Sequence, residues 1–157
     1  MPLRKLILAN IEEIISGAAL TVTISIVAIN VIFRYFFSMS FNWAEEIATI
    51  AFSWVVFVGA AACYKRKMHI GIDVLVNIMP PGIRKTLETG IGVFLIALNC
   101  YLLYLSVIFA ASAWDKPTAV LLLPYTFVDG SACVGFAFMI YHAARQMAET
   151  MKTQRRA

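Results

Sequence analysis

The side chains that could do chemistry in this sequence lie almost entirely outside its long apolar stretches. The chain has 13 Lys and Arg and 9 Asp and Glu residues, and none of them falls in the middle of an apolar stretch. Ion-coupled transport and proton relays need ionisable groups inside the membrane, where such groups mark the pathway. Asp129 is the nearest exception, because it lies about one turn inside its stretch if that helix starts at Pro124. By itself, the chain is therefore typical of a scaffold or accessory subunit.

Catalysis is disfavoured by the number and position of the histidines. His69 and His142 both fall near the ends of apolar stretches, whereas a haem or di-metal centre within a bundle needs several His or Glu residues on facing helices. No zincin, serine-hydrolase or phosphate-loop spacing occurs in the sequence. We therefore expect no enzyme activity, no metal and no cofactor. The cysteines are expected to be small buried hydrophobic residues within apolar stretches, and they are Cys63, Cys100 and Cys133.

Four apolar stretches, separated by charged clusters, fill nearly all of the 157 residues. About 20 apolar residues in a helix are enough to cross the hydrocarbon core of a bilayer. The hydrophobic content of 61% exceeds that of a typical soluble globule. The sequence therefore predicts an all-α membrane protein, a single domain over residues 1–157 with four transmembrane helices. We expect these helices over residues 14–36, 43–64, 83–113 and 120–145.

The distribution of basic residues predicts that both termini are cytoplasmic. All but two of the 13 Lys and Arg residues lie in the N-terminal segment, the second loop or the C-terminal tail. The only basic residues in the first and third loops are Arg34 and Lys116. Positive charge collects on the cytoplasmic side of inner-membrane proteins. The net charge of +4 therefore reflects topology at a lipid membrane and does not indicate nucleic-acid binding.

The second loop is predicted to contain a short amphipathic helix over about residues 70–79, lying in the inner membrane interface. Its apolar residues recur at helical spacing, and they are Ile72, Leu75, Val76 and Met79. The basic cluster that precedes it is Lys65, Arg66 and Lys67. His69 and Asp73 stand four residues apart on its polar stripe, where they could share a charge-assisted hydrogen bond. We interpret this pair as ordering the interfacial helix rather than transferring protons.

Small residues at helical spacing predict where the helices pack, because small side chains let backbones approach closely in lipid. Helix one has two such faces on opposite sides, so it either packs on both sides or belongs to an ordinary four-helix bundle. One face is Gly17, Thr21, Ser25 and Ala28, and the other is Ser16, Thr23 and Asn30. The predicted seam of helix three is Gly92, Asn99, Ser106 and Ala113.

Helix two has one slim face and one bulky face. The slim face is predicted to be a helix–helix seam, and the bulky face is predicted to meet lipid or a partner. The slim face is Ala44, Ala48, Ala51, Val55, Gly59 and Ala62. The bulky face is Trp43, Ile47, Ile50, Trp54 and Phe57.

Helix two is predicted to begin with a capping box. Asn42 can cap the backbone amides, with Glu45 three residues later. Glu45 and Glu46 also lie at the positive end of the helix dipole, so they either only cap the helix or also serve assembly or docking. Arg34, near the end of helix one, either pairs with Asp129 or with one of these two carboxylates, or extends to the lipid headgroups.

Three segments of the sequence resemble one family closely. They are Asn42-Trp43-Ala44-Glu45-Glu46-Ile47, then Gly59-Ala60-Ala61, and then the run from Lys65 through His69 and Asp73 to Met79-Pro80. They resemble the small membrane subunit of tripartite ATP-independent periplasmic (TRAP) transporters. The pattern in that family is a Trp-x-Glu-Glu start of helix two, small residues near the end of that helix, and a basic cluster followed by His-hydrophobic-x-hydrophobic-Asp. The likeness extends over the whole chain in length and number of spans.

This resemblance implies a partnership in the bacterial cytoplasmic membrane. A periplasmic substrate-binding protein would deliver an organic acid, such as sialic acid or a C4-dicarboxylate. A large membrane subunit would carry the substrate and sodium as an elevator, and the small subunit would support it and help the binding protein to dock. The residues expected at a subunit interface or docking surface are Arg34, Trp43, Glu45, Glu46, Ala48, Gly59 and Asp129.

Two other classes of protein remain open. An autonomous small transporter, such as a four-helix multidrug exporter, needs a carboxylate in the middle of helix one, where this chain has uncharged residues such as Thr21 and Ser25. A membrane enzyme or haem protein is disfavoured by the presence of only two histidines.

Overall fold

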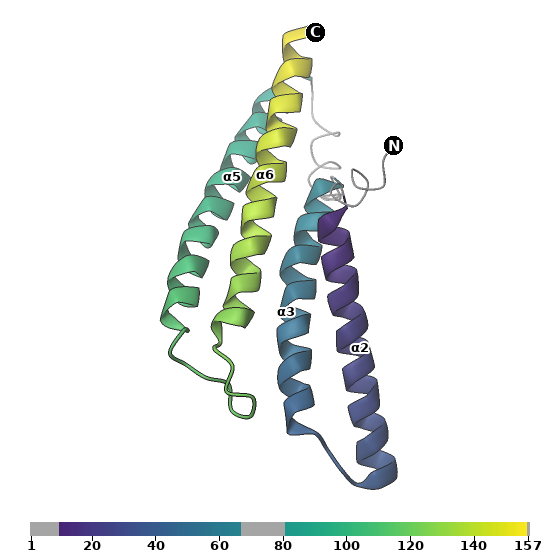
Figure 1. Ribbon diagram of the computed structural model, residues 1–157. Coiled ribbons are helices and arrows are strands. Elements are labelled where there is room, and N and C mark those ends of the chain that lie inside the picture. The colour runs from purple at the N-terminus through teal and green to yellow at the C-terminus, as the bar shows by residue number, and fades with distance from the viewer. Residues whose placement is uncertain (1–9, 67–80, 157) are drawn as a thin grey trace.

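The computed structural model describes residues 10–66 and 81–156. These residues form α2 (Ile11–Phe37), α3 (Asn42–Lys65), α5 (Pro81–Ser112) and α6 (Thr126–Arg156), as Figure 1 shows. Within the described ranges, the β structure is limited to one isolated bridge between Pro117 and Pro124. Each of the four helices contains a stretch long and apolar enough to cross a membrane. The predicted all-α membrane fold is therefore confirmed.

The last helix differs from its predicted range. It begins at Thr126 instead of near residue 120, and it continues to Arg156 instead of ending near residue 145. It begins late because the preceding residues fold back as a loop, in which Thr118 N–H donates to Leu123 O at 2.8 Å and Leu123 N–H donates to Thr118 Oγ1 at 3.0 Å. It continues because the tail after Arg145 contains no proline or glycine to end a helix.

Helix α2 begins and α6 ends at the same end of the molecule (Figure 1). We call this the terminal end, and we call the opposite end, which has the connections 38–41 and 113–125, the loop end. The interfacial helix predicted over about residues 70–79 lies outside the described residues, as do Lys67, His69 and Asp73.

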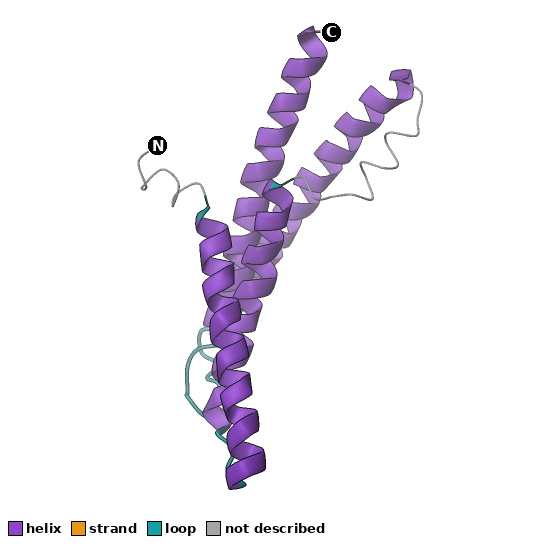
Figure 2. Cartoon of the chain, turned by 90° about the vertical axis from the view of Figure 1, so that its right-hand side faces the viewer, coloured by secondary structure: helices purple, strands orange, loops and turns teal. Residues whose placement is uncertain are grey.

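The helices form a single layer in the order α2, α3, α6, α5 (Figure 1). In the described part of the chain, the helices whose backbones pack side by side are α2 with α3, α3 with α6, and α6 with α5. Figure 2 shows the layer from its α2 side, with α5 leaning away from α6 toward the terminal end. The chain is therefore not a closed four-helix bundle, because its two edge helices do not meet.

The tightest packing in the layer lies between the inner helices α3 and α6. Val58 and Ala61 on α3 and Ser131 on α6 are completely buried. At Gly135 the helices approach so closely that a Cβ would lie 2.7 Å from the Phe57 carbonyl oxygen and 2.8 Å from its Cβ. Only glycine fits such an approach without moving the Phe57 backbone.

The slim face of α3 packs against α2, which confirms the predicted seam. Ala44 and Ala48 are buried near the loop end. Further along the helix, a Cβ at Gly59 would lie 3.7 Å from the Cβ of Ser16, which is ordinary van der Waals contact. Two residues predicted for contact with another subunit, Ala48 and Gly59, therefore lie within this chain's own α2–α3 interface.

The prediction that the bulky face of α3 meets lipid or a partner is wrong for two of its residues. The indole N–H of Trp54 donates to Phe127 O at 3.2 Å, and the ring of Phe57 meets that of Phe136 edge-on, with centroids 5.7 Å apart. These residues face α6 because α3 is an inner helix of the layer and is covered on both sides. Trp43, at the loop end, stays 43% exposed.

The edge helices are less covered. The predicted seam of α5 is confirmed, because Asn99, Ser106 and Ala113 are buried. In α2, the face with Ser16 lies against α3. The opposite small-residue face is exposed in the described structure, and it comprises Gly17, Thr21, Ser25 and Ala28.

Candidate functional site

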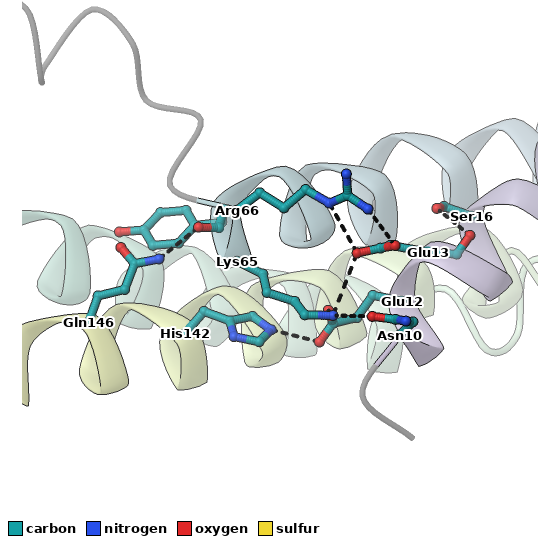
Figure 3. Close-up of polar contacts among 9 residues, drawn as sticks. Asn10, Glu12, Glu13, Ser16, Lys65, Arg66, His142 and Gln146 are labelled. Atoms are coloured by element: carbon teal, nitrogen blue, oxygen red, sulfur yellow. Dashed lines mark hydrogen bonds and ion pairs between the residues drawn. The ribbon is translucent and has the colours of Figure 1, made fainter. Parts of the chain in front are cut away.

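The terminal end contains a buried contact between a carboxylate and an imidazole on helices that are not neighbours in the layer. The carboxylate of Glu12 on α2 lies 2.7 Å from His142 Nε2 on α6 (Figure 3). Glu12 is only 4% exposed and His142 only 6%. The pair thus connects the edge helix α2 directly to the inner helix α6, although α3 lies between them in the layer.

Basic residues at the end of α3 extend this cluster to a third helix. Lys65 Nζ lies 3.7 Å from Glu12 Oε2 and 3.6 Å from Glu13 Oε1. Arg66 donates to both carboxylate oxygens of Glu13, at 2.7 and 3.2 Å, and this hydrogen bonding raises the pKa of Arg66 above its ordinary value. The buried Glu12 Oε2 has no hydrogen-bond partner among the described residues, and the Lys65 ammonium lies 3.7 Å from it. Three helices are therefore tied together at this end by charge.

Sequence reasoning missed this cluster. Lys65 and Arg66 were predicted to belong to an interfacial loop, whereas Lys65 is the last residue of α3 and both contact acidic residues of α2. Glu12 and Glu13 are opposite in charge to Lys65 and Arg66, and all four were expected at the same membrane face. This complementarity could have indicated the ion pairs from the sequence. His142 could not be paired from sequence, because the order of the helices decides that α6 lies beside α3.

At the loop end, Glu46 holds the α5–α6 connection. Its carboxylate accepts the backbone N–H groups of Val120 at 2.6 Å and of Leu121 at 2.9 Å. The following residue, Leu122, has a left-handed φ of 55°, which turns the chain back toward Thr118. Glu46 is therefore not a helix cap of the predicted kind, because it fixes a loop 74 residues away in sequence.

The predicted capping box at the start of α3 is wrong. Asn42 is the first residue of the helix, and the N-cap position is Phe41, which makes no side-chain cap. Instead, Asn30 on α2 accepts the Phe41 N–H through Oδ1 at 3.0 Å. Glu45 is exposed. The start of α3 is thus fixed by a neighbouring helix instead of by its own side chains.

None of the predicted pairs of Arg34 is present among the described residues. Asp129 lies in the first turn of α6 and is half-buried, whereas Arg34 is exposed in the last turn of α2. Arg34 and Glu45 instead line one open groove between the loop ends of α2 and α3, without an ion pair between them. The other lining residues are Ile26, Val27, Asn30, Val31, Ala44 and Ala48.

The cysteines are more exposed than the sequence predicts. Cys63 and Cys100 are exposed on the isolated chain, and Cys133 is half-buried, so the prediction of buried cysteines is wrong for the first two. They face outward because Cys63 lies off the α3 seams and Cys100 lies on the uncovered side of an edge helix. Within residues 10–66 and 81–156, no three His, Cys, Asp or Glu side chains gather as metal ligands would.

Comparison with known proteins identifies relatives along most of the chain. The family model described as "Tripartite ATP-independent periplasmic transporters, DctQ component" matches residues 23–153. The C4-dicarboxylate TRAP transporter small permease protein DctQ of Vibrio cholerae is 35% identical over 106 residues, which are 68% of this chain and 43% of that protein. This chain therefore spans less than half the length of that relative.

Two further relatives are proteins of sialic acid transporters. The small permease protein SiaQ of Vibrio cholerae is 24% identical over 150 residues, which are 96% of this chain and 86% of that protein. The permease protein SiaT of Haemophilus influenzae is 28% identical over 96 residues, which are 61% of this chain but only 15% of that much longer protein. The family match includes α3, α5 and nearly all of α6, the helices that form most of the layer. This multi-pass membrane chain therefore belongs to the DctQ component family of TRAP transporters, whose role is non-enzymatic.

Proposed function

We propose that this chain is the small permease subunit of a TRAP transporter for an organic acid, and that it supports a large permease subunit instead of carrying the substrate. The observation that carries the proposal is the family match over residues 23–153. The placement of charge supports it: among the described helices, the buried acidic and basic side chains are Glu12 and His142, and they lie together at the terminal end. A pathway through the chain would need such groups near the middle of the membrane.

The substrate class follows from the relatives. The printed names of two of them refer to C4-dicarboxylate and to sialic acid, and both are carboxylic acids. We infer that the transporter of this chain also takes up an organic acid. Sodium and the substrate would bind to the large subunit, and this chain would need no cofactor of its own.

The contact with the large subunit is proposed to lie on the free face of α2. This face comprises Gly17, Thr21, Ser25 and Ala28, and it is exposed along its whole length. Small residues allow a helix of another chain to approach closely. The uncovered side of α5 is bulkier and suits lipid, with Phe94, Tyr101, Tyr104 and Phe109 each exposed.

The docking of a periplasmic binding protein is proposed to involve the loop end. The connection 113–125 is held to α3 by Glu46, so its exposed residues Val120 and Leu122 are presented in a fixed position. Trp43 and Asp129 lie at the same end and remain candidates for contact. This proposal requires both termini to be cytoplasmic, which is the orientation that the basic residues favour.

Reconstitution tests the division of labour. The chain, its large permease partner and the binding protein are placed in vesicles, alone and in combination, and uptake of labelled sialic acid and C4-dicarboxylates is measured under a sodium gradient. We expect uptake only when all three proteins are present. Accumulation by this chain alone would instead establish an autonomous four-helix transporter and refute the proposal.

Reporter fusions test the orientation. Alkaline phosphatase, which is active only outside the cytoplasm, is fused after Ala157 or inserted into the exposed connection near Lys116. We expect activity from the insertion and none from the C-terminal fusion. The reverse pattern would place the loop end in the cytoplasm and exclude docking there.

A further inference from the structure

The groove between the loop ends of α2 and α3 combines an apolar floor with two opposite charges that are unpaired within the described part of the chain. Arg34 and Glu45 both line it, and the described structure contains no ion pair between them. Below them the groove continues along α2 as far as Ile26, which is about 12 Å at the rise of an α-helix. Its charged mouth lies within the last turn of one membrane helix and the first turn of the next.

Asn30 adds a polar group between the mouth and the floor. Its Oδ1 accepts the Phe41 N–H at 3.0 Å, and this bond fixes the orientation of the amide, so the side-chain NH₂ is the part left to donate. No other side-chain hydrogen bond of Asn30 occurs among the described residues. The groove therefore offers a cation, a carboxylate and an amide donor above aliphatic side chains.

We propose that this groove binds one phospholipid with a primary ammonium in its headgroup, of the phosphatidylethanolamine class. The guanidinium of Arg34 matches a phosphate, because its planar fork donates two parallel hydrogen bonds. Glu45 matches the ammonium, and Ile26, Val27 and Val31 match an acyl chain. A zwitterionic headgroup satisfies both unpaired charges at once, whereas an anionic headgroup would leave Glu45 beside a second negative charge.

The energetic reason is the position of these charges in a membrane helix. A charged side chain near the hydrocarbon boundary is costly unless it reaches the interface or finds a partner. Arg34 and Glu45 do not pair with each other or with any other described residue. One lipid headgroup supplies both with a partner and covers the aliphatic groove beneath them. The inference requires only that α2 and α3 cross a membrane, so it is independent of the proposed role in transport.

Native mass spectrometry of the full-length chain tests the site. The protein is purified in detergent, delipidated, and titrated with phosphatidylethanolamine, phosphatidylcholine or phosphatidylglycerol of identical acyl chains. We expect the ethanolamine lipid to bind best. Arg34→Gln should weaken its binding about tenfold, the loss expected of one charge-assisted contact. Glu45→Gln should reduce the preference for ethanolamine over choline headgroups, because the amide no longer attracts the ammonium.

The control removes a charge at the same end of the molecule. Lys116 is exposed and lies in the α5–α6 connection, so Lys116→Gln should leave binding unchanged. Equal binding of the three lipids to the wild type, or unchanged binding by Arg34→Gln, would overturn the proposal. The proposal would also be overturned if Arg34→Gln no longer bound the large permease subunit but bound lipid as the wild type does. That result would show that the groove binds a protein partner.

Discussion

The inner pair of helices and the edge helix α2 are held in place by different kinds of contact. Helices α3 and α6 meet through small and buried residues, with a backbone approach at Gly135 that admits no side chain. Helix α2 meets α3 along small residues but is fixed at its terminal end by the charges of Glu12 and Glu13. The layer therefore has a tightly packed centre and an edge helix whose position depends on polar contacts.

The largest effect is expected at the centre. Gly135→Ala places a Cβ 2.7 Å from the Phe57 carbonyl oxygen, so α3 and α6 must move apart. Overpacking of this kind costs about 1–3 kcal/mol, which thermal unfolding of the detergent-solubilised chain would measure. Gly130→Ala on the same helix is the control, because a Cβ there meets nothing within 4 Å. Equal stability of the two variants would show that the centre is not tightly packed.

The next effect is expected at the charged end of α2. Glu12→Ala leaves His142 and Lys65 without their carboxylate, and we expect a loss of about 1 kcal/mol, the scale of one buried hydrogen bond. We place the effect below that of the centre, because Lys65 stays partly exposed and can reach water. Thermal unfolding measures the stability of Glu12→Ala and of a double variant that combines Glu12→Leu with His142→Leu. The double variant should recover part of the loss.

The control for this pair is an exposed ion pair on α6. Arg145 and Glu149 lie 3.4 Å apart at i and i+4, and both side chains are more than half exposed. Glu149→Ala should cost no more than about 0.5 kcal/mol. A loss as large as that of Glu12→Ala would mean that burial does not set the strength of the terminal cluster.

At the loop end we expect a local effect. Glu46→Ala removes the acceptor of the Val120 and Leu121 N–H groups, so the connection should loosen while the helices stay packed. Hydrogen exchange of these two amides should become faster, with little change in the unfolding temperature. Glu45→Ala is the matched control, because Glu45 accepts no hydrogen bond from this connection. Protection retained in Glu46→Ala would contradict the role given to the carboxylate.

The smallest effect on the chain itself is expected on the free face of α2. Ala28→Leu adds bulk to an exposed position, so the stability of the isolated chain should change by less than about 0.5 kcal/mol. If the large subunit covers this face, the same change should reduce its co-purification. Ala48→Leu is the opposite case, because Ala48 is buried against α2 and its enlargement should destabilise the chain directly. Normal assembly of Ala28→Leu would move the subunit contact elsewhere.

Much of the fold was predictable from local sequence properties. Each long apolar segment is predicted to form a helix, because a chain in lipid must satisfy its backbone hydrogen bonds internally. The seam of α3 against α2 and that of α5 were found from small residues at helical spacing, and Ala44, Asn99 and Ser106 are indeed buried. The start of α6 was misplaced, because the loop before it depends on the contact of Thr118 with Leu123.

Four membrane helices with charges at their ends could be predicted without a structure, because hydrophobic length and charge placement are properties of single segments. The order α2, α3, α6, α5 is known from the three-dimensional packing alone. That order brings His142 to Glu12 and Glu46 to Val120, pairs that lie 130 and 74 residues apart in the chain. Such pairs follow from which helices are neighbours, and no periodicity within one helix specifies its neighbour.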